Sequence, residues 1–441
     1  MPDSAADNTS KLPQTGLPRS VDELPEFSKL LGNSGVNFVS PGYRELFATS
    51  ERMFRLHNGR VLVFRHDDLR KLGANPIVTN VPHDISMRMS FSGPDDNPLQ
   101  MHESDQIRRL LSMQFFTADC SEQHREMKPV FSKPLLSKQM PPYTEIIGEL
   151  ASKLFETYRD RSEFDLFADL GVRIGFDFWG KVFKMSDAEI AAMERIMERI
   201  MEGMAPVAVA GSRGRDALVG LNNTIPEYFE VLTNVMSRIG AERGSPILKS
   251  IADEFASPEN NFRFLAQGPE IFLAANILDG FHAMGIGISI VLFWLAINPD
   301  TVDTLRENPD LVDAAVNEAL RLTPPVAMIH RYVAEHFIYE GIELCKGTIL
   351  LLHWAAGNRD PLVHDDPNEY NINRPQKPLL TFGSGAQICP GRNLVRALST
   401  EVVRKLISSG LALEIAGDVE WLEDCTLISR QHPTAAPAVL R

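Results

Sequence analysis

The longest apolar stretch of the chain, residues 271–297, limits its fold more than any other feature. It is long enough to suggest a transmembrane helix, but Asp279 and His282 interrupt it and leave only residues 283–297 free of ionisable groups. That remainder is shorter than the roughly 20 apolar residues that span a bilayer. We therefore predict a buried central helix. The polar first 20 residues contain no apolar run that could act as a signal peptide or anchor.

Helical periodicity dominates the middle of the chain. Apolar residues recur at helical spacing from about residue 143 to residue 335. Strand signals appear at 52–64, where Asn58-Gly59 predicts a hairpin with a type I′ turn, and again at 336–354. These patterns predict a mainly α fold with a small β portion.

The bulk composition predicts one large globular domain. With 441 residues and 44% hydrophobic content, residues 26–441 can bury a large core, whereas residues 1–25 are polar and are expected to be loosely ordered. The net charge of −14 argues against nucleic acid as a partner. The four cysteines are far apart and form no CxxC pair, which argues against a zinc site or disulfide scaffold and fits a reducing compartment. They are Cys120, Cys345, Cys389 and Cys425.

A glycine-rich segment ending in a cysteine carries the strongest chemical signal. Residues 382–391 read Phe-Gly-Ser-Gly-Ala-Gln-Ile-Cys-Pro-Gly and precede a helical pattern. Gly383 and Gly385 allow tight turns and a close approach to a flat ligand. The helix that follows directs N–H groups at the Cys389 sulfur and favours its thiolate, a suitable axial ligand for haem iron. The alternative is a buried structural cysteine.

This segment resembles the haem-ligand loop of the cytochrome P-450 family, Phe-Gly-x-Gly-x-x-x-Cys-x-Gly, at every fixed position. The resemblance implies a haem b held by Cys389 as its only protein ligand. Phe382, Gly383, Gln387 and Gly391 would complete the loop, with Gln387 where relatives often have His or Arg. Membrane-bound members carry an N-terminal anchor helix that is missing here, so we expect a cytoplasmic protein of the bacterial type that does not bind membranes.

Three charged residues match a network that supports the loop in this family. Glu318 and Arg321 lie three residues apart and face the same side of a helix, where they can pair. They fall within a segment similar to the Glu-x-x-Arg helix of the family, and Arg374 matches the third member of its Glu-Arg-Arg network. The resemblance gives these residues structural support of the site, without a part in bond chemistry.

Two arginines match positions that bind the haem propionates in relatives. Buried carboxylates require cationic partners. Arg108 lies in a segment that looks like the propionate-binding helix of the family, although Ser104 replaces the usual histidine four residues earlier. His102 lies two residues before Ser104 and offers a replacement. Arg331 matches a second propionate arginine.

The central helix departs from the family pattern Ala-Gly-x-Asp/Glu-Thr-Thr. His282 stands at the position of the usual acid and Ala283 at that of the usual threonine, the pair that normally delivers protons during oxygen activation. Asp279 lies four residues before Ala283 on the same helical face and could be a relocated proton donor or an anchor for a polar substrate group. The alternatives are that Asp279 pairs with a cation or caps a kink beside Gly280, and that His282 is a satisfied core histidine.

The pocket walls are predicted from apolar residues in the segments that surround the haem in relatives. A methionine stripe on one helix is either core packing or an adaptable pocket wall; it comprises Met193, Met197, Met201 and Met204. Besides Asp279 and Ala283, the predicted pocket residues are Met87, Met89, Met101, Ala275, Val326, Met328 and Ile428.

The resemblance favours a haem-thiolate monooxygenase acting on an apolar, small-to-medium organic substrate. Electrons would come from NAD(P)H through a ferredoxin reductase and a ferredoxin, and we expect a monomer. The ferredoxin would dock on the basic side chains Arg392, Arg396, Arg404 and Lys405, which could equally form an ordinary helix surface. The missing acid–alcohol pair leaves four alternatives open: oxygen activation assisted by a hydroxyl of the substrate and a water where the threonine would sit, peroxide-driven chemistry, rearrangement or dehydration without dioxygen, and, remotely, a non-catalytic haem sensor.

Overall fold

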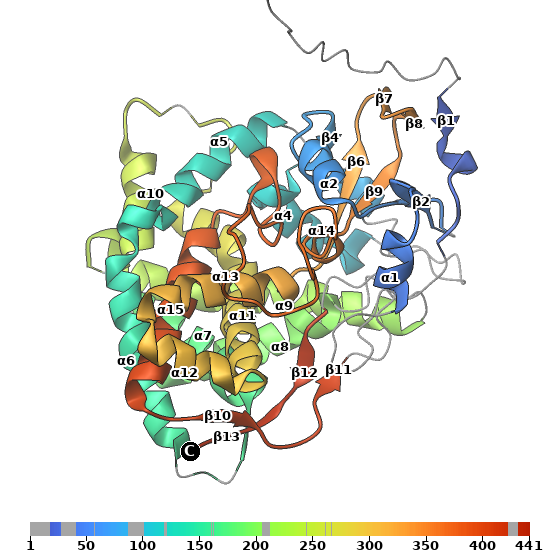
Figure 1. The fold of residues 1–441 in the computed structure, drawn as a ribbon. Helices are drawn as coiled ribbons and strands as arrows, with labels where there is room; N and C mark the ends of the chain where they lie inside the picture. The colour runs from blue at the N-terminus through green and yellow to red at the C-terminus, as the bar shows by residue number, and fades with distance from the viewer. Residues whose placement is uncertain are drawn as a thin grey trace, which may run out of the picture.

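A computed structural model describes residues 18–27, 41–56, 58–86, 101–118, 121–159, 161, 163–204, 212–243, 245–260, 262–265, 267–421 and 431–441. Helices form the larger part of this structure, and small sheets lie along its edges (Figure 1). This arrangement confirms the predicted mainly α fold with a small β portion. The α-helices are α1 (Pro41–Phe47), α2 (His66–Gly73), α4 (Asp105–Met113), α5 (Ser121–Ser132), α6 (Pro141–Arg159), α7 (Arg173–Val182), α8 (Asp187–Met204), α9 (Ser212–Arg243), α10 (Pro246–Ala256), α11 (Pro269–Ala296), α12 (Pro299–Glu307), α13 (Val312–Leu322), α14 (Trp354–Gly357) and α15 (Arg392–Ser409).

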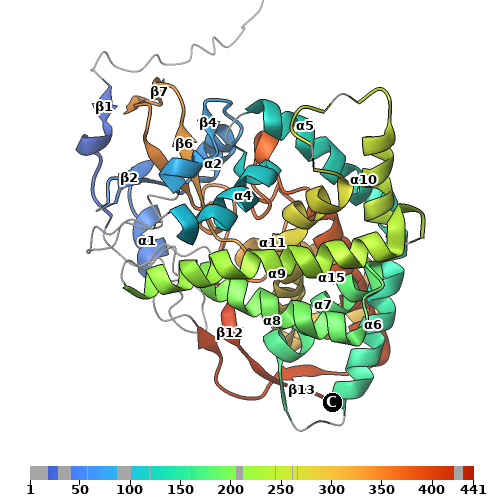
Figure 2. The same cartoon turned by 180° about the vertical axis from the view of Figure 1, so that it is seen from behind.

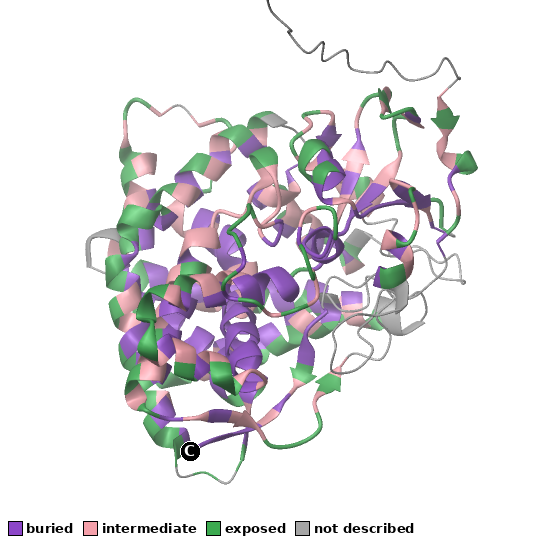
Figure 3. Cartoon of the chain, viewed as in Figure 1, coloured by how far each residue is buried: buried purple, intermediate pink, exposed green. Residues whose placement is uncertain are grey.

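Helix α11 forms the centre of the molecule. It begins with Pro269 at a position where the missing N–H costs nothing, and most of its side chains are buried on every side (Figure 3). Among the described helices it is the one long and apolar enough to cross a membrane, but 78% of its most hydrophobic window is buried inside the protein. The predicted buried central helix is thus confirmed.

Two glycines let α11 contact the π-helix η7 (Leu166–Val172) backbone to backbone. A Cβ on Gly285 would lie 2.6 Å from the carbonyl oxygen of Gly171. A Cβ on Gly171 would lie 1.7 Å from the hydroxyl of Ser289. A methyl group at either position would therefore push the two helices apart.

The remaining helices form layers around α11. Helices α8 and α9 lie side by side as a long pair, and α9 crosses α11 (Figure 2). On the other side, α15 packs between α6, α11 and α13. These layers share one continuous apolar core, whose residues run from residue 107 to the last strand.

Four small sheets complete the fold. The largest has the order β2-β3-β9-β6-β4, with β3 and β9 parallel and its other pairs antiparallel; the others are β1-β8-β7, β10-β13-β5 and β11-β12. The strands are β1 (Arg19–Ser20), β2 (Met53–Arg55), β3 (Val61–Val63), β4 (Val78–Thr79), β5 (Phe164–Asp165), β6 (Ile329–Val333), β7 (Phe337–Tyr339), β8 (Ile342–Leu344), β9 (Ile349–Leu352), β10 (Leu413–Ile415), β11 (Glu420–Trp421), β12 (Pro433–Ala435) and β13 (Pro437–Leu440).

The β2–β3 hairpin forms as predicted, but its turn is of another type. The register pairs Arg55 with Val61, and the amide of Leu56 donates to the carbonyl of Arg60 at 2.8 Å, so three residues form the loop. A type I′ turn needs positive φ at two successive residues. Gly59 has φ of 75°, but the pairing of Leu56 with Arg60 does not fit a two-residue loop at Asn58-Gly59, so the predicted turn type is wrong.

Candidate active site around Cys389

The loop before α15 turns at its two glycines and brings Cys389 back to Phe382. The amide of Cys389 donates to the carbonyl of Phe382 at 2.8 Å. Gly383 has φ of 75° and Gly385 has φ of 66°, a conformation that side chains with a Cβ rarely adopt. A Cβ on Gly385 would also lie 2.4 Å from the Cα of Ala74, so only glycine fits there.

Burial and hydrogen bonding act in opposite directions on the Cys389 thiol. Burial has the larger effect and raises its pKa, while the amides of Gly391 and Arg392 and the charges of Lys128 and Arg392 lower it. The helix N-terminus is therefore present, as the sequence predicts, but it does not by itself make the thiolate the favoured form. A lasting thiolate at this site needs a stronger positive partner, such as a metal ion.

Lys128 of α5 contacts this loop, and a second basic residue, His124, precedes it on the same helix. The ammonium of Lys128 donates to the carbonyl of Ile388 at 2.6 Å and also to that of Ala386. Burial lowers the pKa of Lys128 to about 8, although the nearby Cys389 acts against this. One turn earlier lies His124, which is buried and whose Nε2 has no hydrogen-bond partner among the described residues. Burial, together with the charges of Lys128 and Arg331, lowers the pKa of His124 to about 4.

Arg331 on β6 completes a largely buried group of basic residues, which we call the basic cluster: His124, Lys128 and Arg331, of which His124 is neutral near pH 7. Arg331 is only 6% exposed, and one of its Nη atoms donates to the carbonyl of His330 at 3.0 Å. Burial lowers its pKa to about 10. No carboxylate among the described residues pairs with Arg331. Buried cations of this kind require an anion.

The basic cluster and the cysteine loop together fit a haem. A soft sulfur donor suits the iron, and the charges of Lys128 and Arg331 and the unpaired His124 nitrogen suit the two propionates. Arg108, by contrast, lies on α4, which packs against α9, and its Nη1 pairs with Asp84 at 2.7 Å. The sequence reasoning missed His124 and Lys128, although their spacing of four residues places both on one face of a helix.

Glu318, Arg321 and Arg374 form one buried network, as the resemblance implies. Arg321 binds Glu318 with two hydrogen bonds of 2.7 and 2.8 Å, and Arg374 donates to the same carboxylate at 3.0 Å. Burial alone would raise the pKa of Glu318, but the two arginines and the amide of Asn371 hold it below its ordinary value.

The two arginines of this network also fasten the segment that leads toward the cysteine loop. Arg321 donates to the carbonyls of Asn358 at 2.8 Å and Pro367 at 2.7 Å, and Arg374 donates to that of Asp366 at 3.0 Å. The side chain of Asn358 in turn accepts from the amide of Leu380 at 2.9 Å. The network is thus connected by hydrogen bonds to the start of the loop.

On α11, Asp279 faces α9. It is half-buried, and its charge adds to the effect of burial in raising the pKa of Tyr228 well above its ordinary value. The Tyr228 hydroxyl donates to the carbonyl of Ala274 at 2.8 Å, one turn before Asp279. The helix continues unbroken through Gly280, whose carbonyl accepts from the indole of Trp179 at 3.1 Å. The structure thus shows no kink for Asp279 to cap.

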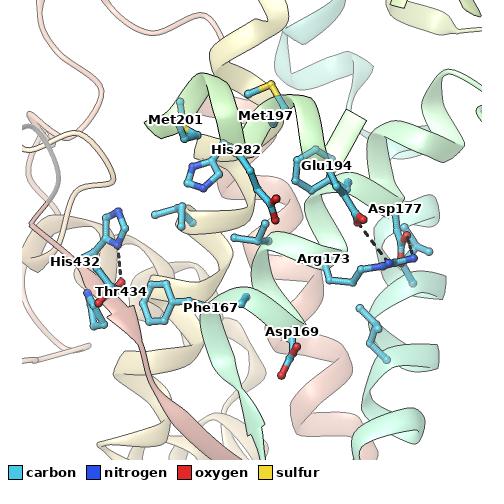
Figure 4. Close-up of a pocket in the computed structure, with 18 of the residues that line it drawn as sticks. Phe167, Asp169, Arg173, Asp177, Glu194, Met197, Met201, His282, His432 and Thr434 are labelled. Atoms are coloured by element: carbon cyan, nitrogen blue, oxygen red, sulfur yellow. Dashed lines mark hydrogen bonds and ion pairs between the residues drawn. The ribbon is translucent and has the colours of Figure 1, made fainter. Parts of the chain in front are cut away.

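His282 lies in a different environment. It lines a half-open cavity of about 890 Å³ between α6, α7, α8, α11 and β12, together with Met197 and Met201 (Figure 4). On the cavity wall, Arg173 pairs with Asp177 at 3.0 Å and with Glu194 at 3.4 Å. Asp279 is not among the residues that line this cavity, so the structure places the two titratable residues of α11 in separate surroundings.

The predicted methionine stripe takes both of the roles considered. Met193 and Met197 are buried in the core, and Met197 and Met201 also line the cavity of Figure 4. That cavity differs from the predicted pocket around Asp279. Met204 has a side chain outside the described part of the structure.

The other predicted pocket residues are placed only in part. Ala275 is buried on α11, Met328 is buried among core residues next to the largest sheet, and Val326 is 42% exposed. Gln114, in the segment before α5, donates to the carbonyl of Ala275 at 2.9 Å and so joins that segment to α11. The predictions for Met87, Met89 and Ile428 and for the Met101 side chain lie outside the described residues.

Comparison with known proteins gives a consistent answer. The sequence model of the family described as Cytochrome P450 matches residues 272–407. The chain is 29% identical over 174 residues to a Beta-dihydromenaquinone-9 omega-hydroxylase of Mycobacterium tuberculosis, covering 38% of this chain and 36% of that protein. It is 34% identical over 134 residues to a Biotin biosynthesis cytochrome P450 of Bacillus subtilis, covering 30% and 34%. These matches span about a third of each relative.

The fold itself matches over most of its length. The crystal structure of P450BioI in complex with an acyl carrier protein carrying hexadec-9Z-enoic acid superposes with a TM-score of 0.74 at 17% identity, covering 90% of this chain and 98% of that one. A fold match of this extent agrees with the family match and with the cysteine loop before α15. The sequence match over residues 272–407 and the fold match over most of the chain thus both point to the cytochrome P450 family, whose cofactor is haem.

Proposed function

We propose that the protein is a haem-thiolate monooxygenase that oxidises an apolar, small-to-medium organic substrate. The observation that carries this proposal is the cysteine loop with the adjoining basic cluster, which provides a sulfur ligand and partners for two carboxylates. Haem, when bound, supplies the activation of dioxygen. The residues of the chain hold the group: Cys389 would bind the iron, Lys128 and Arg331 would neutralise the propionates, and His124 would offer them a hydrogen bond. Phe382, Gly383, Gln387 and Gly391 shape the loop, and Arg108 remains a further candidate at the edge.

The substrate class is argued from the relatives and from α11. One relative is named as a hydroxylase of a menaquinone, and one solved structure holds a protein-linked fatty acid. Both names indicate long apolar substrates. On this chain, Ala275 and Ala283 lie on one face of α11 with Asp279 between them, so that face is small and apolar with a single carboxylate. An apolar molecule with one hydroxyl or amino group suits this face.

Asp279 is proposed as the proton donor that replaces the missing acid–alcohol pair. It lies on the same face of α11 as Ala283, which has no hydroxyl. The Asp279 carboxyl is half-buried, and a carboxyl group is of the type that serves as a general acid. His282 lies toward the cavity of Figure 4, and its proposed role is secondary.

A ferredoxin is proposed as the electron donor. On α15, Arg396 and Arg404 are exposed, and Arg392 donates to the carbonyl of Cys389 at 3.4 Å. Lys405 pairs with Glu401 at 3.5 Å, so its charge is partly neutralised. Positive side chains next to the sulfur ligand suit an acidic partner. Together with a reductase and NAD(P)H this gives a cytoplasmic electron chain, with the enzyme acting as a monomer.

The reduced carbon-monoxide spectrum tests the sulfur ligand. The wild type should show the strongly red-shifted Soret band of thiolate ligation, and Cys389→Ser should lose it. Survival of the band in Cys389→Ser would refute the assignment.

The reaction class needs a second experiment. Substrate-dependent NADH consumption with ferredoxin, reductase and oxygen is expected, with one product molecule per NADH in a coupled enzyme. Turnover with hydrogen peroxide alone, or turnover without oxygen, would instead support the peroxide-driven or the rearrangement alternative. Charge reversal in Arg396→Glu and Arg404→Glu should slow reduction by ferredoxin but not by dithionite.

A further inference from the structure

The β7–β8 hairpin carries a group of side chains that the P450 site does not use. His336 directly precedes β7, Glu343 lies on β8, and Cys345 directly follows β8. One nitrogen, one carboxylate oxygen and the sulfur all lie within 4.8 Å of one another. The Nδ1 of His336 lies 3.8 Å from the Oε1 of Glu343. The hairpin lies at the edge of the molecule, beside β1 (Figure 1).

The strand register explains why these side chains meet. Phe337 pairs with Leu344 and Tyr339 with Ile342, so the next position brings His336 opposite Cys345. Because successive side chains of a strand point to opposite faces, Glu343 and Cys345 share a face, and His336 shares it from across the pair. Three donors therefore lie on one side of two adjacent strands.

The opposite face fixes the backbone that carries these donors. Ile342 and Leu344 are buried in the core cluster of the sheets, and Phe337 and Tyr339 pack against that cluster. The turn at Glu340 and Gly341 is tight, with φ of 49° and 79°, and β8 is also paired with β1 on its other edge. The donors thus project from a supported surface into solvent, and only their side chains need to move.

The donor set suits a zinc ion. Zinc binds cysteine sulfur, histidine nitrogen and carboxylate oxygen in tetrahedral geometry, with neighbouring donors about 3.3–3.8 Å apart. The present spacing comes within about 1 Å of that range, a difference that side-chain rotation covers. A thiolate and a carboxylate would neutralise the divalent charge, and water would fill the fourth position.

We propose that His336, Glu343 and Cys345 form a surface binding site for a zinc ion, separate from the haem site. Binding joins the sulfur of Cys345 to the metal and releases its proton to solvent. The hairpin is then fastened across its open end, next to the strand β1 that it pairs with. This site does not depend on the proposed monooxygenase function.

The site is tested on the haem-loaded protein after removal of adventitious metal with EDTA. Titration calorimetry with zinc chloride should show one site per chain, and two buffers of different ionisation enthalpy should show release of about one proton. His336→Ala, Glu343→Gln and Cys345→Ser should each weaken zinc binding roughly tenfold or more. Glu335→Gln, beside the site, is the matched control and should bind as the wild type does.

Alkylation of Cys345 measures zinc binding by a method independent of calorimetry. The thiol is exposed, so iodoacetamide should label it readily, and saturating zinc should slow the labelling roughly tenfold or more, measured on the Cys345 peptide by mass spectrometry. In Glu343→Gln the protection should be lost at the same zinc concentration. Unchanged labelling with zinc, or equal zinc uptake by Cys345→Ser and the wild type, would overturn the proposal.

Discussion

Replacing Arg321 with alanine should remove a substantial part of the stability of this protein. Arg321 is 1% exposed and donates two hydrogen bonds to Glu318. Without it, the buried carboxylate keeps only the hydrogen bonds from Arg374 and Asn371, and the carbonyls of Asn358 and Pro367 lose a donor. Breaking a buried pair costs about 3–5 kcal/mol, against a total stability of about 5–15 kcal/mol for a typical domain.

The assay compares unfolding and haem content. Urea unfolding of Arg321→Ala, followed by tryptophan fluorescence, should give a free energy of unfolding lower by that amount, and the ratio of Soret to protein absorbance should fall to a small part of the wild-type value. Arg321→Lys keeps the charge but loses the planar contact with two hydrogen bonds, so its stability and haem content should lie between those of the wild type and Arg321→Ala. The matched control is Arg159→Ala, whose i,i+3 partner Glu156 lies at 2.8 Å but is exposed.

Each variant removes the i,i+3 partner of a glutamate, but only Arg321 is buried and also donates to backbone carbonyls. Arg159→Ala should change the free energy of unfolding by no more than about 0.5 kcal/mol. The low pKa of Glu318 adds a pH dependence: its contribution is complete above the unfolded pKa and is lost as pH falls through the folded one. A soluble, fully haem-loaded Arg321→Ala with unfolding free energy within about 1 kcal/mol of the wild type would refute the argument.

Three further predictions concern the site. Asp279→Asn should lower the amount of product formed per NADH roughly tenfold or more. His282→Phe should lower it far less, and Ala283→Thr should be tolerated. Normal coupling in Asp279→Asn would show that protons arrive by another route. The pKa of His124 is about 4 in the folded protein and about 6.5 in the unfolded chain, so the haem-free protein should lose stability as pH falls from the higher to the lower value. Urea unfolding at pH 7 and 5 measures this loss, and His124→Phe should make the stability depend less on pH. Gly385→Ala should lower the free energy of unfolding by roughly 2–5 kcal/mol and prevent haem binding, because it adds a clash to an unfavourable φ. Gly59→Ala has a similar φ but open space around it, so it should cost about 1–2 kcal/mol and keep haem. Equal losses of stability in the two glycine variants would contradict this.

Local patterns predicted the fold class and the central helix well. The residues 271–297 had to be buried because their two ionisable groups exclude a simple membrane span, and α11 is buried. The Glu318 network was also predictable, since its members fall in motifs with fixed spacing. The hairpin turn was not, because Asn58-Gly59 suits more than one loop length and the register, set by strands β2 and β3, selects among them.

The electrostatics of the site were less predictable. The pKa of Cys389 depends on how deeply the loop is buried, and burial is a property of the whole fold. Arg108 and His124 lie in segments that look alike in sequence, both basic and apolar. Only the fold distinguishes their roles, because α4, which carries Arg108, packs on α9, whereas α5, which carries His124, lies near the cysteine loop. The absence of paired cysteines argued against a zinc site, but strand pairing brings Cys345 together with His336 from nine residues away.

The contact of Gly171 with Gly285 limits which changes in sequence this fold can accept. Because the two backbones already touch, α11 cannot shift toward η7, and a larger residue at either glycine would displace the helix, which carries Asp279 and Ala283. The segment 101–118 is joined to α11 in another way, by side-chain hydrogen bonds of Gln114 and Asn276. A contact made by side chains can be replaced by other side chains, whereas a contact between two backbones cannot.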